Sequence, residues 1–146
     1  MAEPVGRRRP GGLIAMPYTE HSADGLALLL WAADPDAPER LATPFFHAAA
    51  AGAMELPVEV YFTARSVRLL VPGVAERLRA SPRHPKTVLD AMREAVSFGA
   101  KLYACTDALH AQGVDPQALI AECAGHGGAV QFMARAADLR WRCLVF

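Results

Sequence analysis

Residues 26–33 read LALLLWAA, a continuous apolar run that stops at the turn-forming sequence DPDAP. A strand with one face in water alternates apolar and polar residues, so an uninterrupted run predicts a strand buried on both faces. Strands of this kind are typical of parallel sheets, in which helices cover both faces. This run therefore favours folds that cover a sheet on two sides.

Short apolar runs and helix-type segments alternate along the rest of the chain. β-branched and aromatic residues predict further strands at PVEVYFTA (57–64), AKLYAC (100–105) and LRWRCLVF (139–146). Helices are predicted from Thr43 as N-cap with Pro44 in the first turn, over 74–80, over 87–98 with Gly99 as C-terminal cap, from Thr106, from Asp115, and over 129–138.

Strands separated by helices indicate βαβ units with right-handed crossovers. We therefore predict an α/β fold, a three-layer α/β/α sandwich around a mainly parallel sheet of about five strands. The 146 residues fit one domain. We place this domain at residues 25–146 and interpret residues 1–24 as an N-terminal extension that is loosely ordered or packed on the surface.

Composition limits the partners of this chain. Basic and acidic residues balance at 15 each, so the net charge gives no reason to expect nucleic acid or a membrane as partner. The longest apolar run is far too short to span a membrane. A hydrophobic fraction of 53% at zero net charge favours self-association, and we expect a homo-oligomer.

Cofactor and metal motifs are missing from the sequence. There is no CxxC pair, no HExxH, no phosphate-binding glycine loop and no GxSxG, so we expect no cofactor and no metal. No pair of the histidines shows a metal-ligand spacing: His21, His47, His84, His110 and His126. We interpret His47 as a packed or interface residue and His126 as a loop residue. Asp34, Thr63 and Arg65 lie at or just after the ends of predicted strands and are candidates to line a cleft together with Cys105.

Cys105 is the main candidate for chemistry. It lies at the carboxyl end of a predicted strand, where ligands and reactive groups gather in such folds. If Thr106 begins a helix, that helix's free N–H groups favour the thiolate, which is the nucleophilic form. Asp107 would disfavour the thiolate, and a protonated His110 would offset this. The alternative is that Cys105 is a small buried hydrophobic residue.

The other two cysteines are interpreted as structural. Cys123 falls on the helix predicted from Asp115, and Cys143 falls inside the last strand. An odd number of widely spaced cysteines is no disulfide framework, and free thiols fit a reducing cytosol. We therefore expect a cytoplasmic protein.

Four segments of the chain, taken together, resemble the DsrE/DsrF-like sulfur-relay family. They are VEVYFTARSVRLLVPGVAERL, TVLDAMREAVSFGAKLYACTDAL, GVDPQALI and GGAVQFMARAADLRWRCLVF. The resemblance covers roughly residues 25–146 and implies a three-layer α/β/α domain that assembles into oligomers. It also implies that Cys105, as the cysteine at the end of the strand predicted over residues 100–105, carries a persulfide.

Three functions remain open at this point. The first is a cytoplasmic sulfur carrier or sulfurtransferase that holds a persulfide on Cys105 and meets sulfur donor and acceptor proteins. The second is a non-catalytic interaction subunit of the same fold, in which the sulfur of Cys105 is buried. The third is a small-ligand-binding domain that uses the cleft at the strand ends.

Overall fold

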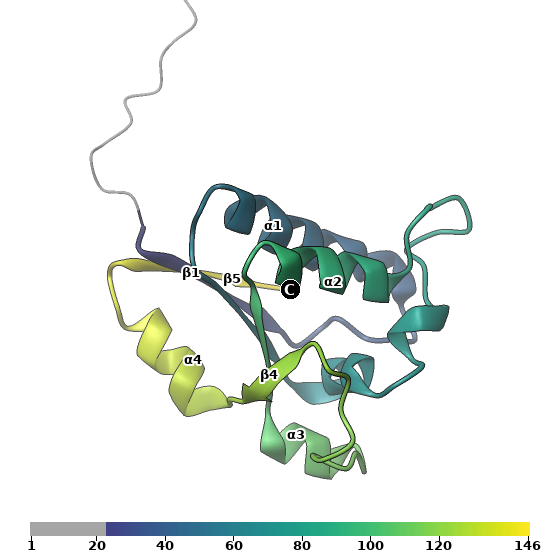
Figure 1. The fold of residues 1–146 in the computed structure, drawn as a ribbon. Coiled ribbons are helices and arrows are strands. Elements are labelled where there is room, and N and C mark those ends of the chain that lie inside the picture. Colours follow the sequence, from purple (N-terminus) through teal and green to yellow (C-terminus); the bar gives the residue numbers. More distant parts are fainter. Residues whose placement is uncertain (1–22) are drawn as a thin grey trace, which may run out of the picture.

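The computed structural model of the protein describes residues 23–146, so most of the predicted N-terminal extension, His21 included, lies outside the described residues. A sheet of five strands, all parallel, forms the centre of the fold (Figure 1). The strands are β1 (Gly25–Leu30), β2 (Val58–Phe62), β3 (Lys101–Ala104), β4 (Cys123–His126) and β5 (Trp141–Val145). The predicted fold class and strand number are confirmed, and the sheet is parallel throughout.

The strand order is β4-β3-β2-β1-β5. The chain moves from β1 to β2, β3 and β4 in one direction and then returns to pair β5 with the open edge of β1. β1 therefore has a neighbour on both sides, with Leu29 opposite Tyr61 on one side and Val145 on the other. The interior position of β1, between two strands of a sheet that is covered on both faces, explains why its sequence is uninterrupted in apolar residues.

Helices cover both faces of the sheet (Figure 1). They are α1 (Ala42–Ala53), α2 (Val88–Ser97), α3 (Thr106–Ala111) and α4 (Ala129–Ala136). α1 and α2 lie side by side on one face, and α4 lies on the other. The reversal of direction before β5 accounts for this placement, because right-handed crossovers in opposite directions fall on opposite faces.

The hydrophobic core lies between the sheet and the α1–α2 layer. Its largest fully buried side chains include Phe45, Phe62 and Met92. α1 lies close to the end of α2: a Cβ atom built at Gly52 of α1 would lie only 2.5 Å from the carbonyl oxygen of Phe98, the C-cap of α2. Glycine at this position thus permits the packing of the two helices. α4, in contrast, carries no buried residue.

Several predicted boundaries differ from the structure. β1 ends at Leu30 rather than continuing to residue 33, and α1 begins at Ala42 with Leu41 as its N-cap, not at Thr43. Residues 74–80 form only the short 3-10 helix Ala75–Arg77. Within residues 23–146, no helix combines the length and the apolarity that a membrane span requires.

The helix predicted from Asp115 is wrong. The Asp115 side chain accepts a hydrogen bond from the Gln117 backbone N–H at 2.8 Å, as the side chain of an N-cap would, and the Asp115 carbonyl accepts one from the Ala118 N–H at 3.1 Å. The chain closes only this one turn, and no helix follows it. The residues that follow pass through turns and then form β4 on the free edge of β3. Cys123 is therefore the first residue of a strand rather than part of a helix.

α2 is capped at both ends, and of the two caps only Gly99 at the C-terminus was predicted. Thr87 is the N-cap, and its Oγ1 accepts a hydrogen bond from the Asp90 backbone N–H at 3.1 Å. The Asp90 carboxylate in turn accepts one from the Thr87 N–H at 2.9 Å, which completes a capping box. Gly99 has a positive φ of 96° and ends the helix, as its position in the sequence predicts.

Replacement of Thr87 by alanine should lower the free energy of unfolding by ~1 kcal/mol, since an N-terminal backbone donor then loses its partner. Chemical denaturation of the wild type and the variant measures this difference. Ser97→Ala is the matched control, because the Ser97 hydroxyl only donates to the Glu94 carbonyl in the last turn. Equal effects of the two substitutions would contradict the capping role.

Candidate functional site

Cys105 lies between the end of β3 and the start of α3, where the sequence predicts it. Its backbone N–H donates to the Phe62 carbonyl of β2 at 3.0 Å, and its carbonyl accepts from the Leu109 N–H at 3.0 Å. The strand and the helix thus fix the backbone of this residue from both sides. The side chain is half-buried and makes no capping hydrogen bond to α3.

The sulfur of Cys105 opens into a cavity of about 280 Å³ at the carboxyl ends of the strands. The sheet side of the cavity is formed by Leu29, Tyr61, Phe62, Thr63 and Cys105. The other side is formed by α4 and the loop before it: Gly127, Gly128, Ala129, Phe132 and Met133. None of these ten lining residues is an aspartate, glutamate, lysine, arginine or histidine, so Cys105 faces a space without acidic or basic side chains.

Two glycines bring the loop before α4 close to the sulfur. Gly127 is buried, and its N–H donates to the Ala104 carbonyl at 2.9 Å, which ties the loop to the end of β3. A Cβ atom there would lie 3.1 Å from Cβ of Tyr103. Gly128 is the N-cap of α4, and a Cβ built on it would lie 3.7 Å from Sγ of Cys105. The start of α4 therefore borders the sulfur directly.

Tyr61 is the aromatic wall of the cavity and is almost fully buried. Its ring stacks on Tyr103 with centroids 5.5 Å apart and meets Phe132 edge-on at 5.6 Å. Burial, together with the hydrogen bond that the Tyr61 hydroxyl donates to the Glu59 carboxylate, raises the pKa of Tyr61 well above its ordinary value. Tyr61 therefore stays protonated and cannot serve as a base beside Cys105.

Glu59 is a buried carboxylate, 7% exposed, beneath the α4 side of the cavity. Arg135 of α4 donates to both of its oxygens, from Nε at 2.9 Å and from Nη2 at 2.7 Å. Burial alone would raise the pKa of Glu59, but the hydrogen bonds from Arg135 and Tyr61 outweigh it and hold the pKa below its ordinary value. The carboxylate is thus charged and paired at neutral pH.

Only some of the residues predicted to line a cleft come together. Thr63 and Cys105 line the same cavity. Asp34 and Arg65 instead form an ion pair of 2.6 Å with each other outside that cavity, and the Arg65 guanidinium also contacts Asp36. The hydrogen bond from the Asp36 backbone N–H, and after it the Arg65 side chain, hold the pKa of Asp34 below its ordinary value. Asp107 and His110 are exposed on α3 and do not line the cavity.

Cys123 and Cys143 do not line the cavity either. Cys123 begins β4 and its thiol lies 3.4 Å from the Gly125 carbonyl. Cys143 lies in β5 opposite Ala27 of β1. Burial raises the pKa of both thiols, so both are poorer nucleophiles at neutral pH than an ordinary cysteine.

The described histidines make local contacts. His47 pairs through Nδ1 with the Thr43 carbonyl at 2.8 Å, His84 stacks on Phe46 at 5.5 Å, and Nε2 of His126 lies 3.3 Å from the Pro116 carbonyl. His126 ends β4 rather than sitting in the predicted glycine turn. Among residues 23–146, no cluster of three or more His, Cys, Asp or Glu side chains could hold a metal ion.

Sequence reasoning missed Glu59, Tyr61 and Arg135. The signal for Glu59 was present, because it is the single charged residue in the strand segment VEVYF. A charged residue inside a strand that is buried on both faces requires a partner of opposite charge. The sequence could not show that this partner comes from α4, far along the chain.

Replacement of Gly128 by alanine should place a methyl group in van der Waals contact with Sγ of Cys105 and slow the alkylation of Cys105 several-fold. The fold should tolerate the change, at a cost of at most about 1 kcal/mol for a poorer N-cap. Gly125→Ala is the matched control, since no atom lies within 4 Å of a Cβ built there. Mass spectrometry after timed alkylation gives the rate at Cys105 in each variant and in the wild type. An unchanged rate in Gly128→Ala would contradict this geometry.

The fold and the sequence both have relatives. The ychN protein from E. coli superposes with a TM-score of 0.65 at 14% identity, covering 84% of this chain and 99% of that one. MTH1491 from Methanobacterium thermoautotrophicum, a protein of unknown function, superposes with a TM-score of 0.58 at 18% identity and the same coverage. At these identities the two structures show a shared fold alone. No curated protein is significantly similar in sequence. Residues 27–146, however, match the DsrE/DsrF-like family, and the chain belongs to that family.

Proposed function

We propose that the protein is a cytoplasmic sulfur carrier or sulfurtransferase that holds a persulfide on Cys105. The observation that carries this proposal is a half-buried cysteine that opens into a cavity whose lining has no side chain able to act as a base. Hydrolytic and other acid–base reactions need such a side chain. Exchange between a thiolate and a persulfide needs the nucleophile alone.

The reaction balances without an oxidant or a reductant. The Cys105 thiolate attacks the outer sulfur of a donor persulfide, R–S–SH. A bond forms between the two sulfurs, the donor's S–S bond breaks, and the donor leaves as the thiolate R–S⁻. The transferred sulfur keeps its proton, so Cys105 becomes Cys105–S–SH. An acceptor thiolate then attacks the outer sulfur on Cys105, and Cys105 leaves as a thiolate. Membership of the DsrE/DsrF-like family and the similar family fold support this assignment.

The proposed location follows from the thiols. All three cysteines are free in the structure, and unpaired thiols suit a reducing compartment. Sulfur donor and acceptor proteins in that compartment are part of the proposal. The reactive groups of these proteins must reach the carboxyl ends of the strands, where the cavity lies.

Incubation of the full chain with a low-molecular-weight persulfide should add the mass of one sulfur atom, and digestion should place it on the peptide that contains Cys105. Cys105→Ala should abolish the addition. Cys123→Ala and Cys143→Ala are the matched controls and should leave it intact, because neither residue lines the cavity. An unlabelled wild type, or a label that persists in Cys105→Ala, would refute the persulfide proposal. Such a result would favour an interaction subunit or a ligand-binding domain.

We also propose that the chain forms a homo-oligomer. Several large apolar side chains are more than half exposed in the described residues: Trp31, Met54, Val130, Met133, Leu139 and Val145. Exposed apolar surface that is covered by another subunit lowers the free energy of the assembly. Light scattering on a sizing column should give a mass that is a multiple of the 15.7 kDa chain. A mass of one chain across the accessible concentration range would contradict self-association.

A further inference from the structure

α4 is held to the sheet in an unusual way for a helix in a three-layer fold. None of its residues is buried, and none belongs to the hydrophobic core cluster between the sheet and α1–α2. Val130 is 87% exposed, and Met133 is 57% exposed although it lines the cavity. Burial of apolar surface, the usual force that places a helix, is therefore weak here, and specific contacts must set its position.

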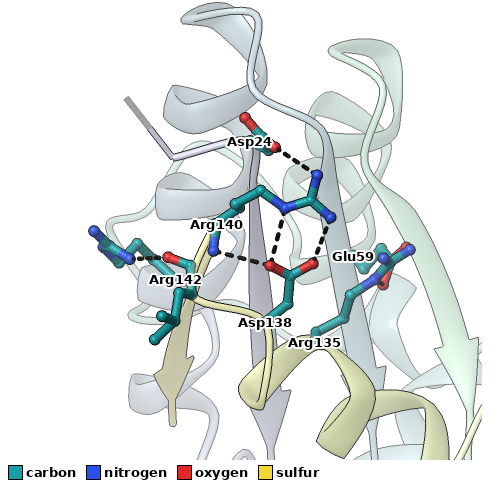
Figure 2. Close-up of polar contacts among 7 residues, drawn as sticks. Asp24, Glu59, Arg135, Asp138, Arg140 and Arg142 are labelled. Carbon is teal, nitrogen blue, oxygen red and sulfur yellow. Dashed lines mark hydrogen bonds and ion pairs between the residues drawn. The ribbon is translucent and has the colours of Figure 1, made fainter. Parts of the chain in front are cut away.

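The main specific contact is the pair between Arg135 and Glu59, which joins the last turn of α4 to the second strand of the sheet (Figure 2). Both guanidinium bonds are short, at 2.9 and 2.7 Å, and they reach different oxygens of one carboxylate. A bidentate pair fixes orientation as well as distance. The same guanidinium lies 4.0 Å above the ring of Trp141 in β5, so Arg135 bridges two strands.

The same carboxylate also holds the wall of the cavity. The Tyr61 hydroxyl donates to Glu59, and the Tyr61 ring meets Phe132 of α4 edge-on at 5.6 Å. Tyr61 and Phe132 both line the cavity. Glu59 therefore binds the aromatic wall on the sheet side and the helix that supplies the opposite wall. A loss of either partner would free α4 to move away from Cys105.

We propose that Glu59 and Arg135 are positioning residues of the Cys105 site. Their ion pair keeps α4 against the sheet and thereby limits the size of the molecule that can reach the sulfur. Neither residue lines the cavity or contacts the sulfur, so neither is a catalytic residue. The inference rests on the proposed function only in taking Cys105 as the reactive sulfur, and its test measures access rather than sulfur transfer.

The chain supplies a matched control in Arg140 and Asp138. Arg140 donates to both Asp138 oxygens at 3.1 and 3.0 Å, much as Arg135 does to Glu59 (Figure 2). This pair is exposed and lies within the turn between α4 and β5. Its chemistry matches that of the Glu59 pair, but it does not join α4 to β2. Removal of this pair should leave α4 in place.

The experiment compares the native-state labelling of Cys105 by a small maleimide and by a bulky maleimide, read for each cysteine by mass spectrometry. In Glu59→Gln and in Arg135→Met, the rate with the bulky reagent should rise by about tenfold, since a charge-assisted hydrogen bond is lost. The rate with the small reagent should rise less. Arg135→Lys, which keeps the charge without the bidentate geometry, should give an intermediate rate.

Two internal comparisons separate local movement of α4 from general loss of stability. Cys123 is the first residue of β4, at the sheet edge opposite β5, and does not line the cavity, so its labelling should stay at the wild-type rate in every variant. Arg140→Gln should behave as the wild type at Cys105. If Glu59→Gln does not fold, as judged by circular dichroism, the conservative Arg135→Lys still decides the matter.

Three results would overturn the inference. They are an unchanged Cys105 rate in Arg135→Lys and Arg135→Met, an equal rise at Cys105 and Cys123, and an equal rise in Arg140→Gln. If the wild type accepts no persulfide while the variants show the expected labelling pattern, the proposed function alone is refuted. A wild type that accepts persulfide while the variants label like the wild type would refute the positioning role alone.

Discussion

Parallel pairing is the constraint on which the rest of this structure depends. In a parallel sheet every strand points the same way, so the carboxyl ends of β1, β2 and β3 meet at one edge. That edge gathers Leu29, Tyr61, Phe62, Thr63 and Cys105, which are distant in the sequence, around one cavity. Parallel strands that follow one another in the chain are also joined by crossovers, and the crossover from β4 at one edge of the sheet to β5 at the other contributes α4, the opposite wall.

The two faces of the sheet are stabilised by different forces. On one face, α1 and α2 bury a continuous set of apolar side chains with a close helix–helix approach at Gly52. On the other face, α4 is fixed by a buried carboxylate and its arginine. A buried ion pair adds little net stability compared with apolar packing, because desolvation offsets much of its attraction. Its value is that it fixes the position and orientation of α4, which forms one wall of the cavity.

The sequence predicted the fold class because its strongest signals are local. The apolar run at β1, the helical pattern of residues 87–98 and the glycine at position 99 all act within a few residues, and each is found in the structure. β4 was missed because residues 123–126 have little strand propensity of their own. They form a strand only through pairing with β3. The strand-end position of Cys105 was also predictable, since it follows from the end of one strand and the start of one helix. The contact between Glu59 and Arg135, 76 positions apart, depends on strand order and could not be predicted.

The division of labour between the two faces has a consequence for how such a protein can change. The residues of α4 lie outside the hydrophobic core cluster. Apart from Arg135, whose loss would leave the Glu59 charge buried and unpaired, substitutions at these positions therefore alter the walls around Cys105 at little cost in folding free energy. Chains that share the α1–α2 side could therefore diverge in the molecules that they admit while keeping one common architecture. Selection for a new ligand and selection for a stable fold would then act on separate sets of positions.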